Sequence, residues 1–455
     1  MSGADVSGAG AVKCGGKAVN STRRSPWLLV IVLPAGLAAL VAALWVYVSL
    51  TAEPLHPGSA SVPSRMRAAP PPQRAGAVER ARMAVRESVA AQSLPGVSVA
   101  AGMHGEVVWE EGFGYANLWR GEPVTAGHRF RLGSASILLA SASAGLLIEE
   151  GRLRIDDEIQ KYVPDYPRKQ WPVTLRMLMG HTAGLADGEL PRREHCESAA
   201  EALKRVEDAP LRFPPDSGFR PAVTGWVLVS AAIEAAAGKP LPEWIRQRVL
   251  DPLEMRDTVV DPGPEPALVA GEDPPPAILF RELIHDPEAE LHSGGQRAGE
   301  ARRREAAYYA PRFRSNPRHG RHMMRLIDCS CLSGAGAYWS TPADLVRFGM
   351  AFAGGRLLRP ETVDLLAAPQ RLSTGEVVDY GLGWQTWSVP LAGKAARAIG
   401  HDGELAGGQV ATVLVFPEYE MVVAVAANIV HADTHSIAVK VAQALAEPAA
   451  GGQRR

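Results

Sequence analysis

Cysteine is scarce in this chain. Its 455 residues include four cysteines, Cys14, Cys196, Cys329 and Cys331. Their spacing predicts neither a disulfide framework nor a pair of Cys-x-x-Cys metal ligands. We interpret Cys329 and Cys331 as two small buried side chains, with a redox-sensitive pair as the alternative.

An excess of one charge sign is also absent. The net charge is −1, with 21% charged and 46% hydrophobic residues. This balance excludes an overall electrostatic attraction to nucleic acid and is typical of a globular protein rather than a disordered one. A chain of this length can bury a large core, as one big domain or as a domain with a lobe.

Residues 27–50 form a run of 24 residues without a charge. As a helix, such a run crosses about 30 Å of hydrocarbon. Basic residues precede it and Glu53 follows it, which predicts a single-pass membrane protein with a cytosolic N-terminus and an extracytoplasmic main domain. A cleavable signal is the competing interpretation, but the run is long for one and no small-x-small cleavage site follows it. The basic, acid-poor N-terminus also leaves a mitochondrial membrane open.

The remaining boundaries follow from composition. Residues 1–26 form an N-terminal tail, and the Pro/Ala/Ser-rich residues 51–78 predict a tether without a fold of its own. The main domain is expected over 79–448, with an irregular, Pro-, Gly- and Arg-rich insertion at 262–325. Residues 449–455 form a C-terminal tail.

Two predicted β-hairpins lie at opposite ends of this domain. One covers residues 97–117 and turns at His104-Gly105, and the other covers 409–430 and turns at Pro417-Glu418. A helix precedes the first hairpin and another follows the second, and helices are expected between them at 134–150, 153–162, 173–185, 213–238 and 241–258. We therefore predict an α+β fold, an α/β sandwich in which one antiparallel sheet is flanked by helices and a mostly helical lobe is inserted.

Ser134 stands at the start of the buried helical stretch FRLGSASILLASASAGLLIEEG. A serine there has its backbone N–H directed along the positive end of the helix dipole, where an oxyanion can be held. The alternative is that Ser134 only caps the helix, which serine often does.

Several short passages resemble the class C β-lactamase and penicillin-binding serine hydrolase family. They run in the family's order over roughly residues 80–445: FRLGSAS, VTLRMLMGHTAGL, FPPDSGF, GAGAYWSTPADLVRF, YGLGW and GHDGELAGG. The resemblance implies a sheet-plus-helical-lobe fold. It also implies Ser134 as the nucleophile, with the N–H groups of Ser134 and Glu404 as oxyanion donors.

The catalytic motifs depart from the family's pattern. Its S-x-x-K motif has Ile137 in place of the lysine, and its Tyr/Asn motif is replaced by Pro221, Ala222 and Val223. The third motif, Lys- or His-Thr-Gly, is matched by His401, Asp402 and Gly403. By resemblance Asp402 and Gly403 contact substrate. In a regular strand Asp402 and Glu404 face the same way, so we expect them to repel an anionic acid group.

Several other side chains are candidates for catalytic, structural or metal-binding roles. His401 is the candidate base for Ser134, whereas His181 is expected to hold a loop by hydrogen bonds. Tyr338 and Tyr380 are expected to be packing residues. No cofactor is expected, because the histidines of the insertion lack a metal-binding spacing: His285, His292, His319 and His322. The arginines between 302 and 325 are expected in a solvated loop, with anionic lipid as the alternative.

Two hypotheses follow. In the first, the chain is a membrane-anchored, β-lactamase-like protein with degraded motifs that acts by binding a small molecule, peptide or ester, or by forming a homo-oligomer. In the second, it is an active serine hydrolase of esters or amides that lack an anionic group, with Ser134 as nucleophile and His401 as base.

Overall fold

The computed structural model describes residues 26–51, 55–118, 120–188, 195–206, 208–261, 304–306, 309–311, 321–323, 328–405, 408–430 and 432–446. The chain divides into two compact units, Met1–Ala52 and Glu53–Arg455. The first unit contains helix α1 (Pro26–Thr51), so the prediction that the uncharged run is helical is confirmed. Over the side chains that are described, which in α1 are those of 34–47, no helix is long and apolar enough to cross a membrane.

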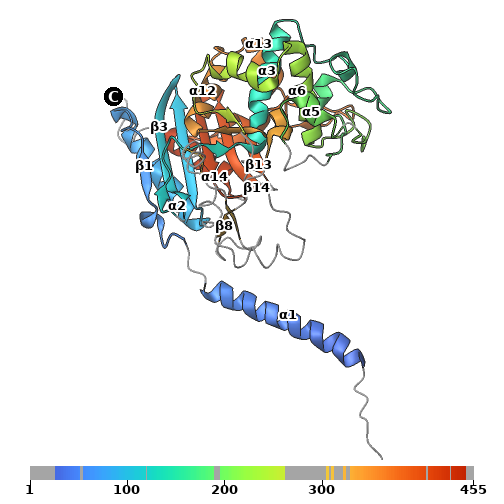
Figure 1. Cartoon of the computed structure of the whole chain (residues 1–455). Coiled ribbons are helices and arrows are strands. Elements are labelled where there is room, and N and C mark those ends of the chain that lie inside the picture. The colour runs from blue at the N-terminus through green and yellow to red at the C-terminus, as the bar shows by residue number, and fades with distance from the viewer. Residues whose placement is uncertain are drawn as a thin grey trace, which may run out of the picture. The chain divides into compact units, whose positions relative to one another are not determined.

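The second unit is built on one antiparallel sheet of eight strands (Figure 1). Its order is β1-β3-β2-β15-β14-β13-β12, and β4 pairs with β3. The predicted pairing of the two ends of the domain is confirmed, because β2 lies beside β15 with Val99 opposite Val425. The strand bounds are β1 (Ser64–Met66), β2 (Gly96–Met103), β3 (Glu106–Asn117), β4 (Glu122–Pro123), β12 (Gln385–Leu391), β13 (Lys394–Leu405), β14 (Gly408–Phe416) and β15 (Met421–Ala427).

Each face of the sheet supports its own hydrophobic core. Alternate strand residues pack against helices α2 (Ala75–Ala91) and α14 (Thr434–Ala446) on one face, as Val99 and Val425 do. Residues of the opposite parity, such as Ala424 and Val413, face α12 (Pro342–Ala353) and the helical lobe. The period of two along the strands therefore produces the predicted sandwich.

The lobe is less helical than the sequence predicts. The expected helices at 134–150 and 213–238 are present as α3 (Ile137–Glu149) and α6 (Val223–Ala237). By contrast, the stretch 153–162 contributes only a 3-10 turn at Ile159–Lys161, and 173–185 contributes only α4 (Leu175–Met179). The other lobe helices are α5 (Ala199–Leu203), α7 (Leu241–Ile245), which continues into a π-turn at Arg246–Leu250, and α13 (Pro360–Ala367).

The expectation that residues 51–78 form a tether is wrong over its described part. Strand β1 pairs with β3, Ser64 opposite Phe113. Val62 is buried, and the buried His56 forms a hydrogen bond through Nε2 with the carbonyl of Leu94, 3.0 Å away. The sequence pattern does not predict this strand, because the segment is rich in proline and because three strand residues are too few to show an alternating pattern.

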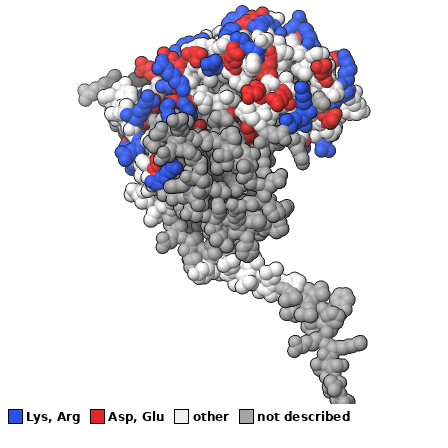
Figure 2. All heavy atoms as spheres, in the orientation of Figure 1, with Lys and Arg blue, Asp and Glu red and all other residues white. Residues whose placement is uncertain are grey.

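Most of the predicted insertion at 262–325 lies outside the described residues. Within it, Tyr309–Pro311 (β7) pairs with Arg321–Met323 (β8). Arg304 forms an ion pair with Asp257 at 2.6 Å. On the face shown in Figure 2, basic and acidic side chains of the described residues are interspersed, in keeping with the near-zero net charge.

Candidate functional site

Ser134 lies in a 3-10 turn, Gly133–Ser136, that leads directly into α3. Its neighbours Gly133 and Ala135 are buried, whereas Ser134 is partly exposed. The side chain of Ser134 makes no capping hydrogen bond, because the residue that precedes α3 as its N-cap is Ser136. The interpretation of Ser134 as a helix cap is therefore wrong. Among the described residues, none forms a hydrogen bond with the Ser134 hydroxyl.

Strand β13 touches the backbone of this turn. A Cβ atom at Gly403 would lie 1.9 Å from the carbonyl oxygen of Leu132, and one at Gly133 would lie 2.2 Å from that of Glu404. Gly133 also has a positive φ of 53°, a conformation that costs glycine little. The two backbone segments that carry the expected oxyanion donors, Ser134 and Glu404, are thus in direct contact.

The position of the family's lysine is filled by a core residue. Ile137 is 4% exposed and packs within the hydrophobic core of the lobe. Shifting the motif to Ser136 does not help, because its hydroxyl is buried and accepts a hydrogen bond from the Tyr338 N–H at 3.3 Å. A buried isoleucine one helical turn after the serine cannot accept its proton.

The triplet that replaces the Tyr/Asn motif forms the start of α6. Its backbone donors are satisfied by two loop side chains. The Ala222 N–H donates to Nδ1 of His181 at 3.3 Å, and the Val223 N–H donates to a carboxylate oxygen of Asp187 at 2.6 Å. The prediction that His181 holds a loop by hydrogen bonding is therefore confirmed.

His181 is neutral in this setting. Its Nδ1 accepts a hydrogen bond, so the proton of the neutral ring lies on Nε2. Burial, and secondarily the proximity of His401, lower the pKa of His181 to about 3. His181 packs against Tyr380, with ring centroids 5.0 Å apart, and Phe219 packs against the same tyrosine.

His401 is buried, and both of its ring nitrogens are engaged. Nδ1 lies 2.6 Å from the carbonyl oxygen of Asp402, to which it can only donate. Nε2 is then the acceptor for the hydroxyl of Tyr380, 3.0 Å away. Burial lowers the pKa of His401 to about 4 and raises the pKa of Tyr380 above its usual range.

The sequence missed the role of Tyr380. It is a packing residue, as predicted, but it is also the hydrogen-bond partner of the candidate base. Tyr338, the other predicted packing residue, is buried, and burial raises its pKa above the usual range. A tyrosine in the YGLGW passage was the available signal, but only the fold brings it to His401.

That Asp402 and Glu404 face the same way stays a prediction. The register of β13 against β14 shifts between Gly403 and Glu404, because β14 carries one extra residue, Val410, between Ala411 and Gln409. The carboxylate of Asp402 accepts a hydrogen bond from Thr412 at 2.6 Å and lies 3.2 Å from Nδ1 of His435, on the α14 side of the sheet. Glu404 is exposed.

No group of three or more His, Cys, Asp or Glu side chains in the described part of the chain could hold a metal ion. Of the histidines considered for a metal, His285, His292 and His319 lie outside the described residues, and His322 lies in β8.

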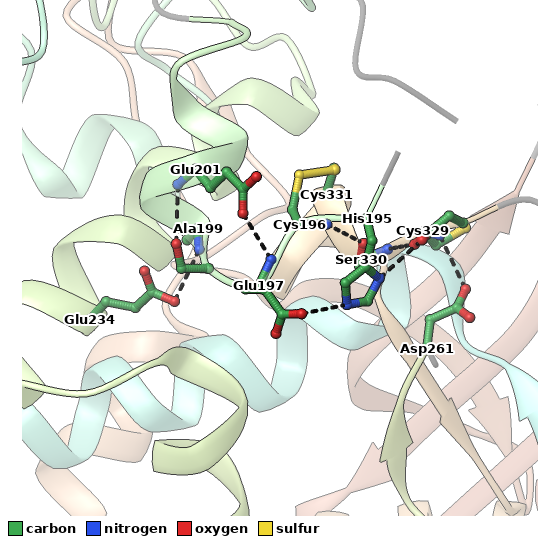
Figure 3. The surroundings of a disulfide bond; sticks show 12 residues. His195, Cys196, Glu197, Ala199, Glu201, Glu234, Asp261, Cys329, Ser330 and Cys331 are labelled. Carbon is green, nitrogen blue, oxygen red and sulfur yellow. Dashed lines mark hydrogen bonds and ion pairs between the residues drawn. A yellow bond between two sulfur atoms is a disulfide. The ribbon is translucent and has the colours of Figure 1, made fainter. Parts of the chain in front are cut away.

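Cys329 and Cys331 are both buried, as predicted, but the alternative that they pair with each other is wrong, because Cys331 is bonded to Cys196 (Figure 3). Cys196 and Cys331 form a disulfide across 135 residues, with their Cα atoms 4.9 Å apart. Cys329 is a buried free thiol, which accepts a hydrogen bond from the Arg131 guanidinium at 2.6 Å. Sequence separation concealed this pairing, because cysteines so far apart meet only through the fold.

A family model described as Beta-lactamase matches residues 81–446. The chain belongs to this family. It is 25% identical to penicillin-binding protein 4* of Bacillus subtilis over 313 residues. This alignment covers 67% of this chain and 62% of that protein. It is 29% identical over 230 residues to esterase EstB of Burkholderia gladioli, with 46% of this chain and 58% of that protein covered.

A third relative is the human mitochondrial serine beta-lactamase-like protein LACTB. The two are 25% identical over 265 residues, which is 42% of this chain and 48% of that protein. The chain therefore matches less than two thirds of the length of each of these three curated relatives.

Solved structures support the fold. The octameric penicillin-binding protein homologue from Pyrococcus abyssi aligns with a TM-score of 0.62 at 20% identity, covering 80% of this chain and 76% of that one. D-amino acid amidase from Ochrobactrum anthropi aligns with a TM-score of 0.61 at 22% identity, covering 81% and 98%. At these identities the likeness concerns the fold alone.

Proposed function

We propose that this chain is a β-lactamase-family protein that has lost efficient acyl transfer and uses the site around Ser134 for binding. One observation carries the proposal: Nε2 of His401, the nitrogen that would take the serine proton, is 3.0 Å from the hydroxyl of Tyr380. Since Nδ1 is bound to the carbonyl of Asp402, the ring has no free acceptor while this pairing lasts.

The protonation states of His181, His401 and Tyr380 support the same conclusion. The pKa values of His181 and His401 are lowered to about 3 and about 4, and the pKa of Tyr380 is raised. All three side chains are therefore neutral at pH 7. A serine hydroxyl is a poor nucleophile without an activated base nearby, and a lost general base costs about 10²–10⁴ in rate.

The retained features favour a neutral carbonyl ligand. The contact between the Gly133 turn and β13 keeps the segments of Ser134 and Glu404 together, and backbone N–H groups there suit a polarised carbonyl oxygen. The exposed carboxylate of Glu404 disfavours a ligand with an acid group at the same end. An ester, amide or peptide carbonyl without a neighbouring carboxylate fits best.

We further propose that residues 27–50 anchor the protein in a membrane, with the N-terminus cytosolic. The uncharged run and the basic residues before it support this arrangement. The disulfide between Cys196 and Cys331 supports an extracytoplasmic main domain, because disulfides persist in oxidising compartments. The name of the human relative keeps a mitochondrial membrane as the alternative. Alkaline carbonate extraction of membranes, followed by protease protection, tests both anchoring and sidedness.

Residual hydrolysis is the second candidate function. The partial exposure of Ser134 favours it, and one of the relatives is named an esterase. In this case Ser134 would attack and His401 would serve as base after releasing Tyr380.

A turnover assay separates the two candidates. The full-length chain and Ser134→Ala are compared on p-nitrophenyl acetate and on nitrocefin. We expect the same background rate from both proteins on both substrates. Turnover that is at least about tenfold faster in the parent than in Ser134→Ala would establish the hydrolase and overturn the binding proposal.

A further inference from the structure

A cavity lies on the face of the sheet that packs against α14. It is formed along β12, the edge strand of the sheet, and α14, and we term it the β12–α14 groove. Its volume is about 920 Å³, within the range of small-molecule sites. The lining residues that matter here are Trp387, Val389, Arg397, His435, Val439 and Lys440.

The polar anchor of the groove is His435. Its Nδ1 lies 3.2 Å from a carboxylate oxygen of Asp402, and Thr412 fixes that carboxylate with a hydrogen bond of 2.6 Å. Nδ1 therefore carries a proton and Nε2 is left for a ligand. The side chain of His435 is 23% exposed, so a ligand in the groove can reach it.

The charge on His435 is favoured by its surroundings. The hydrogen bond to Asp402 raises the pKa of His435, and Asp433 adds to the effect, although burial opposes it. The other charged side chains around the groove are Arg397, Lys440, Asp379 and Glu418. Positive charge at His435 and Lys440 on the α14 wall suits one carboxylate.

Two basic residues of the groove have no acidic partner among the described residues. Arg397 donates to the carbonyl of Ala367 at 2.8 Å, and Lys440 donates to the hydroxyl of Ser88 at 3.0 Å. Both interactions are with neutral oxygens and leave the charges uncompensated. A bound anion would compensate them.

The apolar wall determines the rest of the ligand. Trp387 packs against His435, with ring centroids 4.9 Å apart, and Val389 and Val439 extend this surface. An indole beside a cationic imidazole provides a flat surface for a ring or a branched chain.

We infer that the β12–α14 groove is a ligand site for a small monocarboxylate with an aromatic or branched apolar body. Ser134 is not among the residues that line this groove. His401 and Asp402 are consecutive residues of β13 whose side chains point to opposite faces, His401 toward Tyr380 and Asp402 toward α14.

Ligand-observed saturation-transfer NMR with phenylacetate and the full-length chain tests this inference. We expect phenylacetate to bind at pH 6 and its uncharged isostere phenylacetamide to bind at least about tenfold more weakly. His435→Gln and Trp387→Ala should each weaken phenylacetate binding by about tenfold or more, while circular dichroism remains that of the parent. Ser134→Ala should bind as the parent does.

Affinity should also fall as pH rises through the raised pKa of His435. Three outcomes overturn the inference: no binding of phenylacetate, equal binding of phenylacetamide, or binding that survives His435→Gln but is lost in Ser134→Ala. The last would place the acid in the family's own pocket. The groove lies on the other face of the sheet, so the result of this binding test does not depend on turnover at Ser134.

Discussion

The hydroxyl of Tyr380 lies 3.0 Å from Nε2 of His401 and donates a hydrogen bond to it. The direction is set by the other ring nitrogen, which is bound to the carbonyl of Asp402. A histidine so engaged is a poor base for a third group. Because Tyr380 holds His401, this histidine does not replace the missing lysine and the missing Tyr/Asn motif as a proton acceptor.

Introducing the family's lysine should not restore activity. In Ile137→Lys the new amine enters a core position that is 4% exposed, where burial of an unpaired charge is costly. The relay tyrosine is still replaced by Pro221. We expect no nitrocefin hydrolysis above the parent and a lower melting temperature, whereas the control Ile137→Met should melt within a few degrees of the parent. Vigorous nitrocefin hydrolysis by Ile137→Lys would contradict the account.

Stability should decrease as pH falls below about 6.5, the ordinary pKa of histidine. The folded-state pKa values of His181 and His401 are about 3 and about 4. Between about 6.5 and these values, the unfolded chain binds protons that the folded chain does not, so protonation favours unfolding. Above that window neither group contributes.

Urea unfolding of the parent and of His401→Gln from pH 7.5 to 4.5 measures this effect. The glutamine is uncharged, and its amide oxygen can accept from Tyr380. We expect the variant to reduce the slope of unfolding free energy against pH by about 1.4 kcal/mol per pH unit. An unchanged slope would show that His401 titrates normally.

The disulfide should be detectable by peptide mapping without reduction. Trypsin leaves Cys329 and Cys331 on one peptide and Cys196 on another. We expect a linked pair in the parent and in Cys329→Ser, but not in Cys331→Ser. Cys331→Ser should also lose about 2–5 kcal/mol of stability. A link that is kept in Cys331→Ser and lost in Cys329→Ser would show that Cys196 is bonded to Cys329, and would contradict the structure.

Gly403→Ala should destabilise the chain. Its Cβ would meet the carbonyl oxygen of Leu132 at 1.9 Å and Cβ of Ala135 at 3.2 Å. The backbone at Leu132 cannot shift without a large cost in free energy. We therefore expect the free energy of unfolding to fall by about 1–3 kcal/mol or more, measured by thermal unfolding. Gly58→Ala is the matched control, since nothing lies within 4 Å of its Cβ position. Equal melting temperatures for the two variants would contradict the contact.

Local patterns predicted the ends of the domain well. The two hairpins and the helices beside them follow from periodicity, and their pairing follows from the need to bury two apolar faces. The short lobe helices were overestimated, because chains such as 173–185 are helical for only a turn before tertiary contacts redirect them. Strand β1 was missed for lack of length.

The candidate site was predictable only in part. Ser134, Ile137 and the Pro221–Val223 triplet are read directly from motif positions. The partner of His401, the direction of Asp402 and the bond between Cys196 and Cys331 depend on contacts between distant segments. The register shift between Gly403 and Glu404, where β14 carries one extra residue, also has no local signal in the sequence.

Fluorophosphonate labelling tests most directly whether Ser134 is an activated nucleophile. The full-length parent, Ser134→Ala and Tyr380→Phe are incubated with the probe at pH 7.5, and intact mass spectrometry gives the labelled fraction over time. The account predicts trace labelling of the parent that Ser134→Ala does not change, because His401 is held by Tyr380. Rapid, stoichiometric labelling of the parent that disappears in Ser134→Ala would contradict it.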